Sequence, residues 1–132
     1  MTQKDIPNYF LPVTQLSENL EDGLLSSLEL IEEYLERIRK HDRTLGAFID
    51  VYEEEARKAA SASDMARASG HIIGPLQGIP VAVKDIIDIE GKITTGGSMV
   101  WKDRRSNLTA TLVRRMIEAG MIVLGKTHTC LL

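Results

Sequence analysis

Residues 74–85 read Gly-Pro-Leu-Gln-Gly-Ile-Pro-Val-Ala-Val-Lys-Asp, and this stretch decides the fold. A loop punctuated by glycine and proline leads into the apolar run Val81–Val83, which is typical of a short buried strand. Lys84 ends that strand. A lysine at the end of a buried strand is costly unless it is paired or exposed. Lys84 is therefore either a surface residue that begins the next loop or a group with a chemical role.

On the N-terminal side of this stretch, an apolar stripe predicts a helix. Ser26 and Glu29 fit a capping box, and Leu25 and Leu30 are placed for a hydrophobic staple. We expect a helix from about Ser27 to His41. Its stripe consists of residues that recur at spacings of four and three, namely Leu24, Leu28, Ile31, Leu35 and Ile38.

The rest of the chain alternates between the two kinds of element. The sequence predicts a strand over 47–52, an alanine-rich helix over 53–69, a helix capped by Thr109 or Asn107 that runs to Ala119, and a strand over 121–124 covered on both faces. Residues 86–100 look irregular. We interpret residues 1–23 as a polar lead-in and residues 24–132 as one α/β domain, since helices that alternate with short buried strands imply a layered fold.

Composition narrows the class of protein. The chain has 132 residues, of which 43% are hydrophobic and 27% charged, as in an ordinary soluble domain. A net charge of −3 offers no basic field for nucleic acid or an anionic membrane. No apolar run approaches the roughly 20 residues of a spanning helix. A single cysteine, Cys130, and the lack of a signal layout lead us to expect a cytoplasmic protein.

Several motifs in one order resemble the amidase signature family, enzymes that cleave the carbon–nitrogen bonds of carboxamides. The resemblance runs from about Leu24 to Thr129. It implies helices layered around a mixed sheet, of which this chain would hold an incomplete, N-terminal portion. The matching residues are Gly74, Pro75, Leu76, Gly78, Ile79, Pro80, Val81, Lys84, Asp85 and Asp88, then Gly91, Thr94, Thr95, Gly97 and Ser98, then Ala110, Thr111, Val113 and Arg114, and finally Ala119, Gly120, Leu124, Gly125, Lys126 and Thr127.

This resemblance implies that Lys84 is the catalytic lysine of an amide hydrolase. It would act through a bridging serine, held by a cis peptide, on a nucleophilic serine that forms an acyl-enzyme. Such a lysine must be neutral, so its pKa has to fall from about 10.4, as burial away from carboxylates would favour. Asp85 follows directly, but consecutive strand side chains point to opposite faces, so Asp85 is free to anchor the loop instead. The resemblance also implies a small-molecule amide as the substrate of the complete enzyme, and we expect no cofactor and no metal.

The two serines of the family lie in a Gly/Ser-rich segment well downstream of the lysine. Ser61 and Ser63 fall in the alanine-rich helix and Ser98 in a loop motif, so we carry over Lys84 alone and expect this chain to be inactive by itself. Leu131 and Leu132 stand where the family has Glu-Phe. We interpret that change as a truncation or a frameshifted gene end, the alternative being a chain that was always this short.

Other interpretations compete with amide hydrolysis. The catalytic subunit of a tRNA-dependent glutamine amidotransferase belongs to the same family, and a non-catalytic interaction fragment is a further possibility. Gly120–Thr127 also matches the phosphate-loop pattern. That pattern needs a strand before it and a helix after it, whereas here a helix precedes it and its middle residues form a strand. The scattered residues His41, His71, His128 and Cys130 fall short of the four ligands of a structural zinc site.

Overall fold

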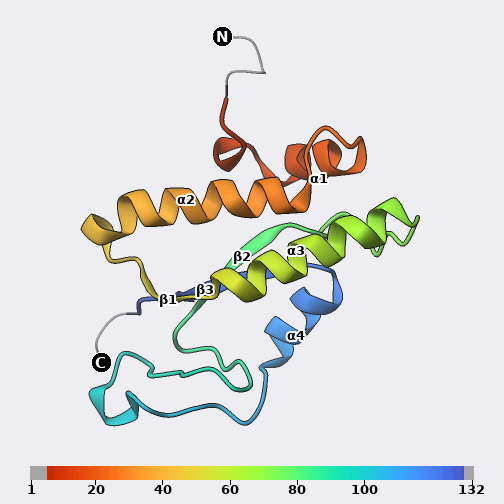
Figure 1. Cartoon of the computed structure of the whole chain (residues 1–132). Coiled ribbons are helices and arrows are strands. Elements are labelled where there is room, and N and C mark those ends of the chain that lie inside the picture. Colours follow the sequence, from red (N-terminus) through yellow and green to blue (C-terminus); the bar gives the residue numbers. More distant parts are fainter. Residues whose placement is uncertain (1–5, 130–132) are drawn as a thin grey trace.

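A three-stranded sheet with helices on both faces forms the described part of the chain, residues 6–129 of the computed structural model (Figure 1). The α/β fold class predicted from the sequence is therefore confirmed. In chain order the elements are the 3-10 turn η2 (Asn8–Phe10), the helices α1 (Val13–Glu21) and α2 (Ser27–Leu45), strand β1 (Phe48–Val51), helix α3 (Glu53–Ala68), strand β2 (Pro80–Lys84), the 3-10 turn η3 (Met99–Trp101), helix α4 (Thr111–Glu118) and strand β3 (Ile122–Thr127).

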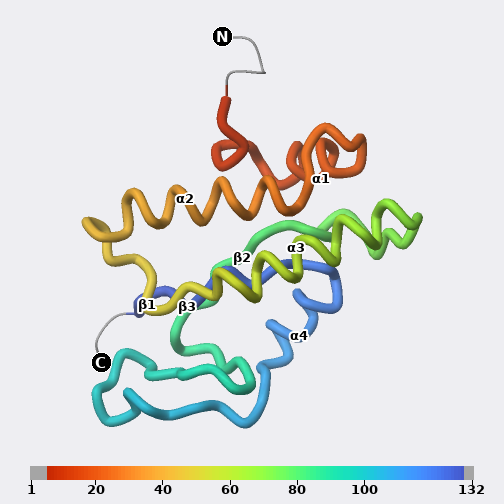
Figure 2. The backbone as a smooth tube through the Cα atoms, in the orientation of Figure 1, coloured from red at the N-terminus to blue at the C-terminus, as the bar shows by residue number. Residues whose placement is uncertain are grey.

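The sheet is mixed, and its central strand is the last of the three strands in the described part of the chain. The strand order is β1-β3-β2, with β1 antiparallel and β2 parallel to β3. Parallel neighbours require a long crossover connection. Here the crossover consists of the extended segment 85–110 and α4, which Figure 2 shows as a loop that swings away from the sheet before it returns.

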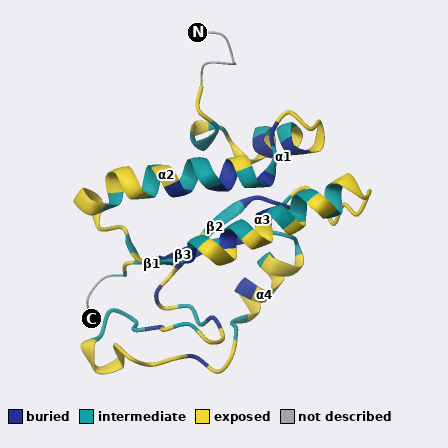
Figure 3. Cartoon of the chain, viewed as in Figure 1, coloured by how far each residue is buried: buried dark blue, intermediate teal, exposed yellow. Residues whose placement is uncertain are grey.

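Two apolar clusters form the layers on either side of the sheet. On one face, α2 and α3 pack against β3 through Ile31, Leu35, Ala56, Ala60, Ile122 and Leu124. On the other face, α4 and the start of the crossover cover β2 through Val83, Ile89 and Val113, with Tyr52 beside them. These buried positions line the sheet and the inner sides of the helices (Figure 3). Each helix contributes one apolar stripe, as the spacing in the sequence requires.

The N-terminal end of α2 is built as the sequence predicts. Ser26 Oγ accepts a hydrogen bond from the N–H of Glu29 at 3.1 Å, and Glu29 Oε2 accepts one from the N–H of Ser26 at 2.8 Å, which completes the capping box. Leu25 and Leu30 share one buried cluster, as expected of a hydrophobic staple. The helix continues to Leu45, four residues past the predicted end.

Two features differ from the sequence prediction. Residues 13–21, which we expected to be lead-in, form the helix α1, whose Leu16 and Leu20 pack on Leu30 and Ile79. Neither Thr109 nor Asn107 caps α4, since the N-cap position is Ala110, without a side-chain hydrogen bond. Thr109 Oγ1 instead accepts a hydrogen bond from the N–H of Glu90 at 3.0 Å, which ties the two ends of the crossover together. None of the described helices is long and apolar enough to cross a membrane.

Gly125 permits the close approach of β1 to β3. A Cβ atom at this position would lie 2.2 Å from the carbonyl oxygen of Asp50 and 3.0 Å from Cα of Val51. Both atoms belong to the backbone of β1 and have no side-chain freedom with which to move aside. The pairing of the two strands therefore depends on glycine at position 125.

We predict that Gly125→Ala destabilises the chain by about 2–3 kcal/mol, because β1 has to move or the strand pair has to open. The matched control is Gly74→Ala, since a Cβ there has open space and the backbone is not left-handed. The measurement is the midpoint of thermal or urea unfolding for both variants and the parent. Equal midpoints for the two variants would contradict this role of Gly125.

Candidate active site

Lys84 lies at the carboxyl end of β2 and its side chain is exposed. Burial alternates along the strand, with Val83 and Asp85 buried and Ala82 and Lys84 exposed. Because alternate strand residues face opposite sides of a sheet, Lys84 projects on the side away from Asp85. No side chain among residues 6–129 forms a hydrogen bond or an ion pair with the Lys84 ammonium. In the described part of the chain this amine is free to meet a ligand or another polypeptide segment.

Asp85 anchors the next loop, as the alternation of strand side chains predicts. Its carboxylate accepts hydrogen bonds from the N–H of Thr95, at 3.2 Å to each oxygen, and a further one from the Thr95 hydroxyl. The carbonyl oxygen of Asp85 accepts from the N–H of Gly96 at 2.8 Å. Only 1% of Asp85 is exposed, so these are desolvated, charge-assisted bonds.

The anchored segment, Thr94–Ser98, is a tight glycine turn. Gly96 and Gly97 have φ angles of +60° and +78°, a left-handed conformation that favours glycine. The N–H of Gly97 donates to Thr95 Oγ1 at 3.1 Å, and the N–H of Ser98 donates to the Thr95 carbonyl at 3.0 Å. All four amides from Thr95 to Ser98 are thus occupied within the protein. The turn is therefore held by its own hydrogen bonds and has no free N–H in this segment for an oxyanion.

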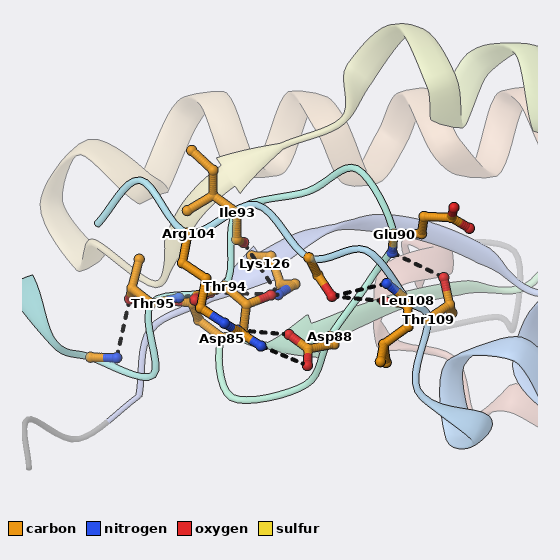
Figure 4. Close-up of polar contacts among 12 residues, drawn as sticks. Asp85, Asp88, Glu90, Ile93, Thr94, Thr95, Arg104, Leu108, Thr109 and Lys126 are labelled. Carbon is orange, nitrogen blue, oxygen red and sulfur yellow. Dashed lines mark hydrogen bonds and ion pairs between the residues drawn. The ribbon is translucent and has the colours of Figure 1, made fainter. Parts of the chain in front are cut away.

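Lys126 is a buried charged residue that the sequence analysis did not single out. It lies near the end of β3 with 1% of its surface exposed. Its Nζ donates to Thr94 Oγ1 at 2.8 Å and lies 3.5 Å from Asp85 Oδ1 (Figure 4). Burial lowers the pKa of the Lys126 ammonium below its ordinary value, and the Asp85 carboxylate opposes that effect. The available signal was a lysine two residues after the predicted apolar strand 121–124, in a position that two neighbouring strands would enclose.

A second ion pair, between Asp88 and Arg104, joins the two ends of the loop that contains Thr94. Arg104 donates to both carboxylate oxygens of Asp88, at 2.9 and 3.1 Å, and also to the carbonyl of Thr94 at 3.3 Å. Figure 4 shows Arg104 reaching from its own segment toward Asp88 beneath Thr94. The hydrogen bonds from Arg104 lower the pKa of Asp88 below its ordinary value. The Thr94–Ser98 turn is therefore fixed from two sides.

The serines that the sequence analysis considered have structural partners or helical positions. Ser63 Oγ lies 3.2 Å from Ser27 Oγ, where it joins α3 to α2. Ser98 Oγ accepts from the N–H of Val100 at 3.3 Å and begins η3. Ser61 lies within α3. None of these contacts places Ser61, Ser63 or Ser98 beside Lys84 as a nucleophile.

The two rival motifs are accounted for by the fold. Gly120 follows α4, and six of the eight residues of the phosphate-loop pattern form β3, with Lys126 buried. The pattern therefore does not form a phosphate loop. His41, His71 and His128 are exposed, and within residues 6–129 no group of three potential ligands gathers to hold a metal ion. Cys130 lies outside the described residues.

Comparison with known proteins identifies the family. The family model described as Amidase matches residues 29–131, so the chain belongs to the amidase family. It is 33% identical over 120 residues to a glutamyl-tRNA(Gln) amidotransferase subunit of Protochlamydia amoebophila and 38% identical over 119 residues to an amidase of Pseudomonas putida. The peptide amidase of Stenotrophomonas maltophilia has the same fold, with a TM-score of 0.85, 39% identity and 92% of this chain covered.

The chain spans about a quarter of the length of these relatives. It covers 24% of the amidotransferase subunit, 25% of the Pseudomonas amidase and 25% of the peptide amidase chain. The N-terminal portion expected from the resemblance is thus consistent with the extent of the match. Most of the sequence of each relative has no counterpart in these 132 residues.

The Asp88–Arg104 pair gives a prediction for acid stability. Because the folded pKa of Asp88 is lowered, the pair's stabilisation is present above the ordinary pKa of 3.8 and is lost as the pH falls below it. At pH 6 we expect the free energy of unfolding of the parent to exceed that of Asp88→Asn by about 1 kcal/mol or less, since both side chains of the pair are partly exposed. Unfolding curves from pH 6 to pH 2.5 should show this gap closing.

The control is Asp103→Asn, because Asp103 is exposed and lies 3.9 Å from Lys102 in a weak pair. The gap between this variant and the parent should stay small at every pH. A gap for Asp88→Asn that stays constant from pH 6 to pH 2.5 would show that the ionised carboxylate does not stabilise the crossover.

Proposed function

We propose that this chain is the N-terminal part of an amide hydrolase in which Lys84 is the general base. The observation that carries the proposal is the position of Lys84, an exposed lysine without a side-chain partner in residues 6–129. It ends β2 and is next in sequence to Asp85, which anchors the Thr94–Ser98 turn. A catalytic base has to reach the proton that it removes, and it has to be held by groups that do not themselves move. Membership of the amidase family supports the choice of amide hydrolysis as the reaction.

The reaction would proceed by acyl transfer. The nucleophilic serine attacks the amide carbon, and its proton passes through the bridging serine to the amine of Lys84. Lys84 is exposed in residues 6–129, so the rest of the enzyme would have to bury it to keep that amine neutral. The C–N bond then breaks as that proton is returned to the departing nitrogen. Water attacks the acyl-enzyme with its own proton taken up by the same relay, and the carboxylic acid leaves. Both serines would come from the downstream Gly/Ser-rich segment that the family resemblance implies.

The oxyanion donors would also come from that segment. The amides of residues 95–98 are already bonded to protein acceptors, and breaking these bonds would cost the turn its shape. This part of the chain would therefore contribute the base and the turn that Asp85 anchors. A cytoplasmic location and a small-molecule amide as the substrate are part of the same proposal.

A second candidate function is that of the catalytic subunit of a glutamyl-tRNA(Gln) amidotransferase. It is favoured by relatives that carry the name of this amidotransferase, including one from Salinispora tropica that is 42% identical over 106 residues. The two candidates share the base and differ in the amide that is cleaved, which would be glutamine in the amidotransferase. Hydrolysis of glutamine that depends on added partner subunits would favour the amidotransferase. Hydrolysis of simple carboxamides without them would favour an amidase.

The role of Lys84 can be tested in a hybrid enzyme. Residues 6–129 replace the matched quarter of the Stenotrophomonas maltophilia peptide amidase, to which they are 39% identical. Lys84→Ala should lower kcat/KM by about 10²–10⁴-fold, the usual contribution of a general base. The control is Lys102→Ala, an exposed lysine in the same crossover, which should leave kcat/KM unchanged. Activity of Lys84→Ala equal to that of the hybrid would refute the assignment.

The 132-residue chain should by itself release no ammonia from simple carboxamides above the buffer rate, because the proposal draws both relay serines from the downstream segment. The measurement is a coupled ammonia assay with the purified chain. A rate that Lys84→Ala abolishes would mean that the chain carries its own nucleophile, and would contradict the proposed division of roles.

A further inference from the structure

Lys126 is among the most deeply buried side chains of this protein, although it carries a charge. Only 1% of its surface is exposed, and it is enclosed near the carboxyl ends of β2 and β3, where Lys126 pairs with Val83. A buried ammonium is expensive to desolvate and is retained only where other groups compensate it. An apolar side chain of similar length, such as methionine, would fill the space without that cost. The lysine therefore calls for an explanation other than packing.

The three donor positions of the ammonium are all used. Nζ donates to Thr94 Oγ1 at 2.8 Å and to the carbonyl of Ile93 at 3.4 Å, and it lies 3.5 Å from Asp85 Oδ1. Thr94 and Asp85 are themselves 3% and 1% exposed. The acceptors come from two separate segments, the strand end that carries Lys84 and the start of the glycine turn. One side chain from a third segment, β3, thus joins them (Figure 4).

The Asp85 carboxylate contacts both Lys126 and the Thr94–Ser98 turn. Asp85 Oδ1 faces Lys126, while Thr95 donates to Asp85 through its N–H and its hydroxyl. Without Lys126, Thr95 would be the one remaining side-chain or backbone partner of the carboxylate within residues 6–129. A buried unpaired charge either takes up a proton or draws in water. Either change weakens the attachment of the turn to the residue next to Lys84.

We propose that Lys126 is a positioning residue of the amide hydrolase, which holds the Thr94–Ser98 turn in fixed relation to Lys84 through Asp85 and Thr94. The last part of this inference rests on the function proposed for Lys84. The first part, the attachment of the turn, concerns only this chain. The experiment therefore has two arms, and they can fail separately.

The first arm measures the attachment by amide hydrogen exchange. Lys126→Met removes the charge at similar length, and Thr94→Val removes the 2.8 Å bond while both charges remain. Each should accelerate exchange at Thr95 and Gly96 by about tenfold or more. The sheet amides of Tyr52 and Ile122, which donate to Leu124 and Ile79, serve as internal references and should be unchanged. Lys102→Met is the matched exposed control.

The second arm measures catalysis in the hybrid with the peptide amidase. At equal folded fraction, Lys126→Met and Thr94→Val should lower kcat by about 10-fold or more with little change in KM, because a displaced support misaligns the reacting groups after the substrate is bound. The double variant Asp85→Asn/Lys126→Met should lose no more than Lys126→Met alone, since coupled residues are not additive.

Two results would overturn the proposal. Uniform acceleration of exchange across turn and sheet would make Lys126 a general stabiliser of the fold. Local acceleration with an unchanged kcat would show that the turn does not govern the reaction. Neither result bears on Lys84, whose own variant in the hybrid decides the proposed function independently.

Discussion

The contact between Lys126 and Asp85 connects the sheet of this protein to the crossover that begins at the carboxyl end of β2. The crossover 85–110 contains little regular structure, so its shape has to come from side-chain contacts. Asp85 fixes its first turn, Lys126 neutralises Asp85, and the ion pair of Asp88 with Arg104 holds the returning segment of the crossover against Thr94. These charged contacts thus fix the shape of a long loop, which in a strand or helix would be set by backbone hydrogen bonds.

The elements that follow a simple periodicity could be predicted from the sequence. The stripe of α2, its capping box and the apolar runs of β2 and β3 all depend on local spacing, and the structure contains each of them. The ends of the strands were less predictable. Both β2 and β3 extend through their lysines, because pairing between the two strands continues after the apolar residues stop. Pairing is a non-local property that a single sequence does not display.

The same reason explains the two differences in detail. Helix α1 has only Leu16 and Leu20 as fully buried residues, and it is stabilised by a cluster that α2 and the loop before β2 supply. Thr109 is a plausible cap by residue type, yet its hydroxyl bonds to Glu90, nineteen residues away. In the site, Lys84 and Asp85 were found from a motif and from strand alternation. Lys126 was matched as part of a motif, but its burial beside Asp85 depends on the register of β2 against β3.

The strand order has a consequence for how the chain folds during synthesis. Within residues 6–129, β1 and β2 each pair with β3 alone, and β3 occupies residues 122–127. While the chain leaves the ribosome, α2 and α3 can meet early, since they are close in sequence and pack together. The two outer strands have to wait, with open edges, until the central strand emerges. Sheet formation, the burial of Lys126 and the setting of the glycine turn would then be a single late event.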